Sequence, residues 1–291
     1  MVLRNTYIHV ILLAQSYSLK TEWALICRQG VIESFVSDGI NPLFQSRIEI
    51  SRILRLQLPQ VFFTTKVDKI YFYGTGCSSS KMKNMVKTPL ETQLKTPAIV
   101  ENNLDGVARS LFQDKAGIAC ILDTESNSCF YDGTSIVKKV RSLGYMLGDE
   151  GSGTTLGKLF LADCLQNIAP KELIKLFYKK NKIDPDGIVD YLYTTQFPNK
   201  ILSVISYFLY ENISHPYIYK LVCDNMKVFL ERNVFQYEDY CNYPIRFVGP
   251  IAKMYSTILR DVAQSIGIYV DSVVESPMKG LIKYHIKKLT I

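Results

Sequence analysis

One arrangement of strand-like segments occurs twice in this chain, and the repeat restricts the fold more than any single motif does. The first copy consists of three short runs rich in β-branched and apolar residues, at 7–14, 21–27 and 31–36. The second copy follows the same plan of strand, loop, strand, turn and strand, at 117–122, 128–131 and 135–137. Such runs are typical of strands. Two copies of one meander predict two related domains.

Helical and strand-like segments alternate through the rest of the chain. Helices are predicted at 49–58, at 81–94 with an interruption at Pro89, and at 104–112, with strands at 69–73 and 98–100. The later part is predicted to be helical across most of 156–180 and at 188–193, 201–211 and 219–237; a strand at 245–249 and helices at 251–266 and 277–285 follow. This order predicts an α/β fold whose second half is rich in helices.

Composition excludes several classes of protein. With 291 residues, 47% hydrophobic and 21% charged, the chain is long enough for two globular domains. Its +7 charge is scattered, so we expect no nucleic-acid partner. The seven cysteines form no CxxC pair, as in a cytoplasmic protein with reduced, buried thiols. The apolar run at 10–14 is too short to span a bilayer, so we expect no membrane segment.

A glycine-rich stretch at 142–157 is the best candidate for a binding loop. It contains five glycines and the adjacent pair Asp149-Glu150, and it runs directly into an apolar helical pattern. Glycines at this density suit backbone that comes close to a ligand, and a helix start offers free N–H groups. The alternative is an ordinary glycine-rich turn that carries two solvated carboxylates.

Several motifs, taken in order, resemble one family. They are Gly39-Ile-Asn-Pro42, Tyr71-Phe-Tyr-Gly74, Gly117-Ile-Ala-Cys120, Ser126-Asn-Ser-Cys-Phe-Tyr-Asp-Gly133, Gly148-Asp-Glu-Gly-Ser-Gly153, Phe197-Pro-Asn199, Phe229-Leu-Glu-Arg-Asn-Val234, Ser276-Pro-Met278 and Gly280-Leu-Ile282. From about Val10 to His285 the chain resembles the bacterial N-acetylglucosamine-kinase-like proteins of the BadF/BadG/BcrA/BcrD ATPase family.

The resemblance implies two RNase H-like domains of the actin/hexokinase type around an interdomain cleft. It further implies ATP and Mg²⁺ as cofactors and an amino sugar as the substrate of phosphoryl transfer. We expect the first domain to span 1–105, joined by the C-terminal helix at 273–291, and the second to span 106–272. The architecture alone does not fix the function, because it also occurs in chaperones and filaments.

The two loops expected to hold the ATP phosphates depart from the family. The first reads Asp-Ser-Gly-Ser-Thr-Lys-Thr in similar proteins; here Gln15 replaces the acid, Tyr17 the glycine and Leu19 a hydroxyl, while Lys20 is retained. The second reads Gly-Thr-Gly-Ser-Asn-Ser in the family, and here it begins Asp123-Thr124-Glu125. Carboxylates beside a polyanion repel it, so we expect ATP affinity to fall.

The residue aligned with the family's general base is Asn103, whose amide cannot accept a proton. Asp105 is two positions further on, and residues at i and i+2 do not share a helix face. At the adenosine end, Pro250 follows Gly249 where the family has a small residue. This change is tolerable, because proline suits the first turn of a helix.

Residues aligned with the sugar-binding side of the family keep usable chemistry. They are Asn41, Ser126, Asn127, the backbone around Gly144, and Asp149. Each has a structural alternative: Asn41 as a turn residue before Pro42, Ser126 and Asn127 as a hairpin cap, and Asp149 as the N-cap of the next helix. We find no metal-binding cluster in the sequence.

Three hypotheses follow. In the first, the protein has lost phosphoryl transfer and keeps an amino-sugar site; it works as a sensor or as the partner of an active paralogue, or it is simply losing its function. In the second, it is a working ATP-dependent N-acetylhexosamine kinase. In the third, it is an interaction protein whose cleft is filled by Tyr17. The resemblance also suggests a cytoplasmic homodimer.

Overall fold

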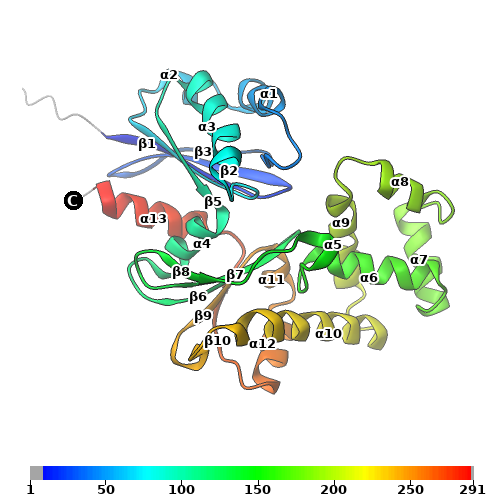
Figure 1. The fold of residues 1–291 in the computed structure, drawn as a ribbon. Coiled ribbons are helices and arrows are strands. Elements are labelled where there is room, and N and C mark those ends of the chain that lie inside the picture. Colours follow the sequence, from blue (N-terminus) through cyan, green and yellow to red (C-terminus); the bar gives the residue numbers. More distant parts are fainter. Residues whose placement is uncertain (1–8, 290–291) are drawn as a thin grey trace, which may run out of the picture. The chain divides into compact units, whose positions relative to one another are not determined.

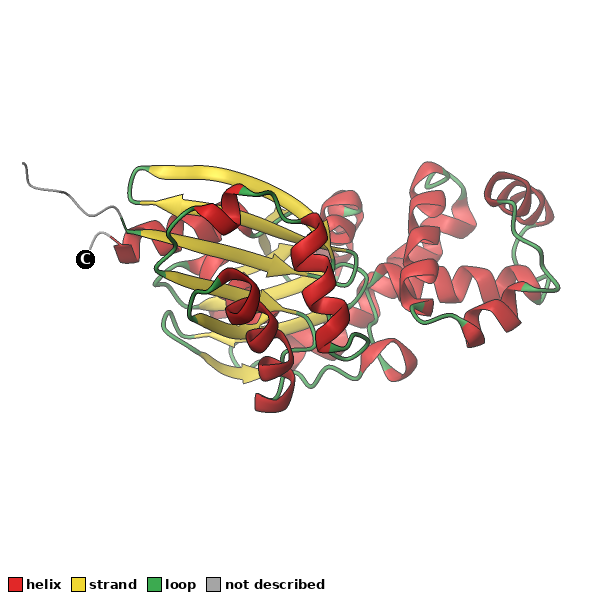
Figure 2. Ribbon diagram, turned by 90° about the horizontal axis from the view of Figure 1, so that it is seen from above, coloured by secondary structure: helices red, strands yellow, loops and turns green. Residues whose placement is uncertain are grey.

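The computed structural model describes residues 9–289, so Tyr7 and Ile8 of the first predicted strand lie outside the described residues. The chain divides into two compact units. The first holds the residues up to Asp114 together with those from Pro277 onward, and the second spans Lys115–Ser276. Each unit contains one five-stranded sheet with helices packed on it (Figures 1 and 2). The predicted α/β class is confirmed.

The sheet of the first unit has the strand order β3-β2-β1-β4-β5. Its strands are β1 (Val10–Ser16), β2 (Lys20–Cys27), β3 (Gly30–Asp38), β4 (Lys69–Gly74) and β5 (Ala98–Asn102). The first three pair antiparallel, whereas β4 and β5 run parallel to β1. The helices of this unit are α1 (Arg47–Gln57), α2 (Val61–Thr64), α3 (Ser80–Leu94), α4 (Asn103–Phe112) and α13 (Met278–Leu289).

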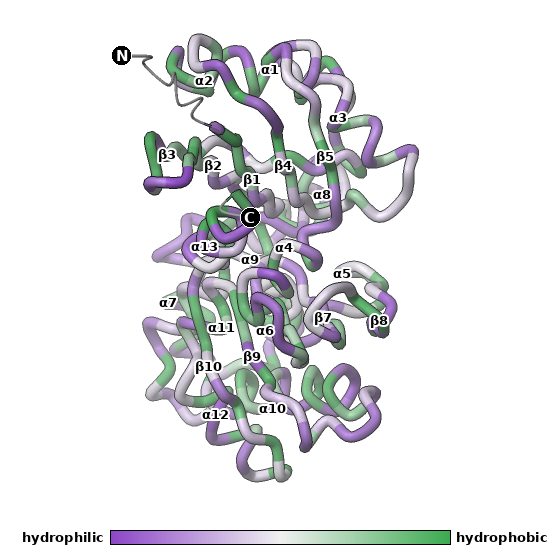
Figure 3. The backbone as a smooth tube through the Cα atoms, turned by 90° about the vertical axis from the view of Figure 1, so that its left-hand side faces the viewer, coloured by the Kyte–Doolittle hydropathy of each residue, from purple (hydrophilic) through white to green (hydrophobic). Residues whose placement is uncertain are grey.

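Strand β1 lies at the centre of this sheet and is buried along its whole length. Its apolar run appears green in the hydropathy view of Figure 3. Leu12 on one face joins a core that includes Leu54 of α1 and Leu90 of α3. Leu13 on the other face joins a smaller cluster that packs against α13. Alternate residues of one strand therefore serve two apolar layers, as the twofold period of a strand requires.

The sheet of the second unit has the order β10-β9-β6-β7-β8, again with an antiparallel meander at one side. Its strands are β6 (Gly117–Leu122), β7 (Ser126–Tyr131), β8 (Ile136–Lys139), β9 (Ile245–Val248) and β10 (Val270–Val274). The helices are α5 (Gly144–Leu147), α6 (Gly153–Leu165), α7 (Lys171–Asn181), α8 (Ile188–Thr194), α9 (Pro198–Glu211), α10 (Pro216–Asn233), α11 (Pro250–Met254) and α12 (Ser256–Ser265), with short 3-10 turns η1 (Val234–Gln236) and η2 (Tyr240–Asn242).

Aromatic side chains fill the core between these helices. Phe160 of α6 stacks on Phe208 of α9 with ring centroids 5.5 Å apart, and both rings contact Phe177 of α7. All three are buried. Rings of this size each remove a large apolar area from water, so they account for much of the stability of the helical part.

Three features of the fold differ from the sequence-based expectations. Helix α3 continues through Pro89, because the proline ring is buried in the core and packing outweighs the lost hydrogen bond. Strand β10 was not predicted; it is an edge strand in which only Val270 is buried, so its apolar pattern is weak. The helix predicted from 251 to 266 is divided at Tyr255 into α11 and α12.

The division between the units also lies elsewhere than expected. A boundary after Asp105 would cut α4, whereas the compact units divide after Asp114. The physical reason is the packing of α4 on α13: the Ser110 hydroxyl donates to the Pro277 carbonyl and the Gln113 amide donates to the Gly280 carbonyl. Residues 273 and 274, expected in the C-terminal helix, belong to β10.

Candidate functional site

The first hairpin loop, residues 16–20 between β1 and β2, is closed by its own backbone. The Tyr17 N–H donates to the Lys20 carbonyl at 2.9 Å. A Cβ on Gly39 would lie 2.3 Å from the Tyr17 carbonyl oxygen, so only glycine allows this approach. The Tyr17 side chain is buried, while Leu19 is partly exposed and Lys20 pairs with Glu22.

Gln15 and Asn103, which are 88 residues apart in sequence, meet where β1 and β4 end and α4 begins. The Gln15 side-chain amide donates to the Asn103 carbonyl oxygen at 3.3 Å. The Asn103 side-chain amide donates to the Thr75 hydroxyl at 2.9 Å. Gln15 Oε1 is buried against Gly106 and has no hydrogen-bond partner among the described residues. These polar groups are all neutral, and none can accept a proton near neutral pH.

Asp105 does not take the place of Asn103. Burial raises the pKa of its carboxyl, with Glu101 raising it further and Arg109 opposing. Glu101 belongs to the end of β5, and Arg109 lies one turn further along α4. Asn103 faces Thr75 instead.

Asn41 forms a turn, as its structural alternative predicted. Its Oδ1 accepts the Leu43 N–H at 3.0 Å, and its own N–H donates to Gln45 Oε1 at 2.7 Å. The side-chain amide nitrogen makes no hydrogen bond to described protein groups. Asn41 is thus held rigidly in the first unit and retains two donors for a ligand.

The second hairpin loop, residues 123–125 between β6 and β7, uses its backbone donors internally. The Asp123 N–H donates to the Glu125 carbonyl at 2.9 Å, and the Thr124 N–H donates to the Asp123 carboxylate at 2.6 Å. The loop is tied to α6, because the Gly153 N–H donates to the Asp123 carbonyl and the Thr154 hydroxyl donates to the Thr124 carbonyl.

Gly249 and Pro250 connect β9 to α11 beside this loop. A Cβ on Gly249 would lie 2.1 Å from the Leu122 carbonyl oxygen, and its φ of +126° also favours glycine. Pro250 is the first residue of α11, where its missing N–H costs nothing. The expected position of this proline in a first helical turn is confirmed.

Four of the residues expected on the sugar side lie near one another in the second unit. The Asp149 carboxylate accepts the Ser126 N–H at 3.4 Å, and Asn127 follows Ser126 in β7. Gly144 begins the short helix α5 and accepts the Gly148 N–H at 2.8 Å, immediately before Asp149. These contacts bring the Asp149 carboxylate to the backbone at the start of β7, next to Asn127.

Asp149 is the only carboxyl in this group, and its pKa is perturbed. Burial raises its pKa to about 6, against a smaller opposing effect of the Ser126 N–H. It adopts a left-handed backbone conformation with φ of +63°. A buried carboxylate with one long hydrogen bond is energetically unfavourable, which is the situation expected of a group that serves a ligand.

Two alternatives for this stretch are wrong. Asp149 is not the N-cap of α6, since Ser152 caps the helix by accepting the Thr155 N–H at 3.1 Å. The acidic pair is not simply solvated either, because Asp149 is buried and Glu150 forms an ion pair with Arg232.

Sequence reasoning missed two hydroxyl residues that organise these loops. Thr75 accepts the Asn103 amide, and Thr154 bridges the Thr124 and Asn199 carbonyls. The signal for Thr75 was its place between two glycines directly after a strand. Thr154 lies within the glycine-rich stretch at 142–157, but nothing in the sequence distinguished it from the other residues of that stretch.

Comparison with known proteins identifies the family. No protein-family model and no curated protein matches the sequence. Among solved structures, a candidate N-acetylglucosamine kinase from Porphyromonas gingivalis is 37% identical, with a TM-score of 0.89 over 95% of this chain and 99% of that one. This chain belongs to the same family of N-acetylglucosamine-kinase-like proteins.

More distant structures support the fold of this N-acetylglucosamine-kinase-like protein. A second candidate N-acetylglucosamine kinase, from Chromobacterium violaceum, is 13% identical with a TM-score of 0.71, covering 95% of this chain and 99% of that one. A ROK-family glucokinase from Streptomyces griseus, solved with glucose and AMPPNP, is 12% identical with a TM-score of 0.53, covering 96% and 98%. The actin/hexokinase type of fold is thereby confirmed.

The described residues contain neither a metal-binding cluster nor a membrane-spanning helix. No group of three or more His, Cys, Asp or Glu side chains within residues 9–289 is arranged to hold a metal ion. None of the helices in the same range is long and apolar enough to cross a bilayer.

Proposed function

We propose that this N-acetylglucosamine-kinase-like protein is a member of the BadF/BadG/BcrA/BcrD ATPase family that has lost efficient ATP-dependent phosphoryl transfer and still binds an amino sugar. It acts in the cytoplasm as a sugar-dependent sensor or partner, as a homodimer or beside an active paralogue. The proposal rests on the contrast between its phosphate loops and its sugar-side residues.

The observation that carries the proposal is the state of the second hairpin loop. In this fold such a loop holds phosphate oxygens with backbone N–H groups. Here the Thr124 N–H already donates to the Asp123 carboxylate at 2.6 Å, so a built-in anion occupies a donor that a phosphate needs. An added phosphate would meet both the lost donor and the charge of Asp123 and Glu125.

The first hairpin loop supports the same conclusion. A buried tyrosine stands at position 17, where the family has a glycine, and the neutral Gln15 replaces the acid that helps to hold Mg²⁺ or its water. ATP and Mg²⁺ therefore do not fit these residues, and we assign them no role in this protein.

Asn103 stands where the family has its general base, so the proton acceptor for the sugar hydroxyl is also missing. A positioned general base contributes about 10²- to 10⁴-fold to a reaction rate. Asn103 donates a hydrogen bond to Thr75 and has no basic lone pair at neutral pH. Asp105 lies two positions further along α4, and residues at i and i+2 do not share a helix face.

The sugar side supports retained binding. Ser126, Asn127 and Asp149 lie together, and the open space around Gly144 leaves backbone accessible. A polyol needs donors and acceptors in fixed directions, and the Ser126 hydroxyl, the Asn127 amide and the Asp149 carboxylate of the second unit supply both. Asn41, in the first unit, uses its amide oxygen for the Leu43 N–H and keeps its amide nitrogen without a hydrogen bond to the described residues.

Isothermal titration of the purified protein tests the proposal directly. Mg-ATP and N-acetylglucosamine are titrated separately, and we expect saturable heat from the sugar and none from the nucleotide. Glucose, which lacks the acetamido group, serves as the control and should bind more weakly.

Other outcomes would reject parts of the proposal. Nucleotide binding at ordinary kinase affinity would favour the active N-acetylhexosamine kinase, and a phosphotransfer assay would follow. Absence of both heats would favour the interaction protein with a filled cleft. A rise in melting temperature with sugar would exclude that last hypothesis independently.

A further inference from the structure

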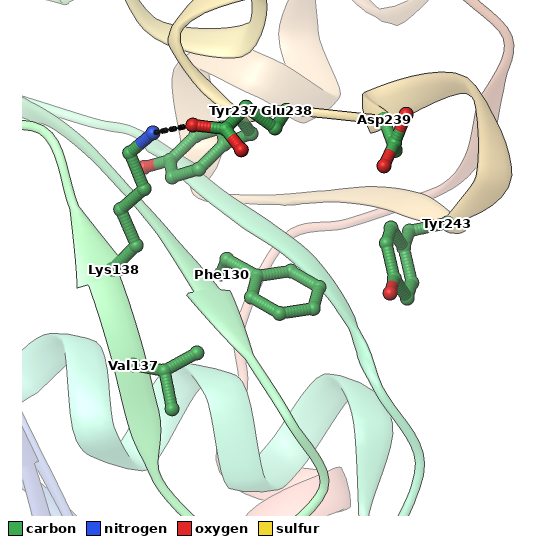
Figure 4. Close-up of a pocket in the computed structure, with 7 residues that line it drawn as sticks. All are labelled: Phe130, Val137, Lys138, Tyr237, Glu238, Asp239 and Tyr243. Atoms are coloured by element: carbon green, nitrogen blue, oxygen red, sulfur yellow. Dashed lines mark ion pairs between the residues drawn. The ribbon is translucent and has the colours of Figure 1, made fainter.

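A hollow of about 320 Å³ opens in the second unit, away from the residues discussed above (Figure 4). Its walls come from β7, from β8 and from the segment at 237–243 after α10. Phe130 lies four residues along β7 from Ser126, which corresponds to about 13 Å of strand. The hollow is therefore separate from the sugar-side residues.

Aromatic rings form most of the apolar surface of this hollow. Phe130 and Tyr243 meet edge to face with ring centroids 4.6 Å apart. Tyr237 is buried, and its hydroxyl is fixed by Ser128 Oγ at 2.7 Å and by the Val140 N–H at 3.3 Å. Rings held in this way form a wall that a ligand meets already ordered.

The charges around the rings do not balance. Lys138 Nζ and the Glu238 carboxylate form an ion pair of 3.8 Å at one side of the hollow. Asp239 lies at the other side in the view of Figure 4. Its carboxylate makes no ion pair or hydrogen bond with the described residues, and it does not cap the 3-10 turn that follows it. Once Lys138 and Glu238 cancel, one negative charge remains beside the rings.

We propose that this hollow binds a small organic ammonium ion, placed against the Phe130 and Tyr243 rings and beside the Asp239 carboxylate. Aromatic rings and an unpaired carboxylate both attract a weakly hydrated cation, and the size of the hollow lies at the lower end of the range for small-molecule sites. A neutral polyol is less favoured, because carboxylates accept hydrogen bonds and cannot donate them. The site acts independently of sugar and nucleotide binding.

Choline and its neutral isostere 3,3-dimethylbutan-1-ol form a matched pair of probes. They share shape and apolar surface and differ in charge. Saturation-transfer NMR titrations of the full chain at low salt measure both affinities. We expect choline to bind about 5- to 30-fold more tightly than the isostere, the range given by a cation–π contact. Added salt weakens choline binding and leaves the isostere unchanged.

Two variants should change the affinity for choline in opposite directions. Asp239→Asn removes the unpaired charge and should weaken binding about fivefold, whereas Lys138→Gln releases Glu238 and should tighten it about two- to fivefold. Tyr243→Leu keeps apolar bulk without the ring and should weaken binding about fivefold. Asp224→Asn on α10 is the control, because Asp224 is exposed and pairs with Lys220 far from the hollow in sequence.

These side chains lie partly or fully exposed to solvent, so the variants should fold, and circular dichroism checks this. Equal binding of choline and its isostere would overturn the proposal, and so would the absence of saturable choline binding. Unchanged affinities would also overturn it, and so would tighter binding to Asp239→Asn with weaker binding to Lys138→Gln, because a site for a neutral ligand predicts the first result and a site for an anionic ligand the second.

Discussion

Asn103 at the start of α4 and Asp149 ahead of α6 have side chains of similar shape but different charge. At the start of α4, Asn103 is a neutral amide that donates to Thr75 and receives Gln15 on its carbonyl. Ahead of α6, Asp149 is a buried carboxyl with a single long hydrogen bond and a pKa raised to about 6. The Gln15, Thr75 and Asn103 side chains at the start of α4 carry no charge. The buried carboxyl of Asp149, in contrast, is charged above its pKa, and this charge opposes folding.

The difference agrees with the proposal that a ligand binds near Asp149 and not near Asn103. A chain free of functional constraint loses buried, unpaired carboxylates easily, because amides of the same shape are more stable there. Asn103 already has this amide form. Position 149 has a carboxyl although an amide would be more stable, and we infer that this carboxylate binds a ligand.

The largest expected effect comes from restoring the two hairpin loops together with the general base at position 103. Combining Gln15→Asp, Tyr17→Gly, Asn103→Asp, Asp123→Gly and Glu125→Gly should raise turnover of N-acetylglucosamine with Mg-ATP by about 10²- to 10⁴-fold, chiefly because a general base returns. A coupled assay of ADP release measures it.

The matched control is the same chain with Asn103 left in place. It should bind Mg-ATP in a titration and still turn over slowly, since its loops are restored and its base is not. A wild-type protein as active as the fully rebuilt one would show that the altered loops and Asn103 do not limit phosphoryl transfer.

The second prediction concerns stability at Asp149. A carboxyl with a pKa raised from near 4 to about 6 binds more protons in the folded chain, so stability falls as pH rises through that window. Asp149→Asn should therefore raise the free energy of unfolding by up to about 3 kcal/mol at pH 8 and change it little at pH 4. Urea unfolding at both pH values measures this.

Asp132→Asn provides the opposite control. The N–H groups of Ser135 and Thr134 hold the pKa of Asp132 below its usual range, so its charge stabilises the fold above that pKa. The asparagine variant should lose stability at pH 8. If Asp149→Asn behaved in the same way, Asp149 would be a structural carboxylate and its assignment to the sugar would fail.

The third prediction is that the stabilising change at Asp149 weakens ligand binding. Asp149→Asn should lower affinity for N-acetylglucosamine about 10- to 100-fold, as expected for hydrogen bonds to a charged group. Glu150→Gln is the neighbouring control and should leave affinity unchanged, because Glu150 pairs with Arg232. Titration calorimetry compares the three proteins at pH 8.

Much of the fold could be predicted from the sequence, because the repeated strands are short runs of apolar and β-branched residues. Strand β1 and its meander follow from apolar runs that are visible without any contact information. The state of Asp149 could not be predicted, since its burial depends on how the loop folds against Ser126 of β7. The contact of Gln15 with Asn103 was hidden for the same reason: it depends on strand order in the sheet and not on spacing in the chain.

The smallest expected effect tests how much the neutral polar groups at the start of α4 contribute to stability. Gln15→Met removes a buried Oε1 that has no partner and one long hydrogen bond, so the free energy of unfolding should change by less than about 1 kcal/mol. Gln45→Met is the matched control. Gln45 bonds both the Asn41 N–H and the Gly39 carbonyl, and its loss should cost about 1–2 kcal/mol. If Gln15→Met were as damaging as Gln45→Met, the amide at position 15 would be an essential support of Asn103, and the contrast with Asp149 would have to be explained by packing and not by charge.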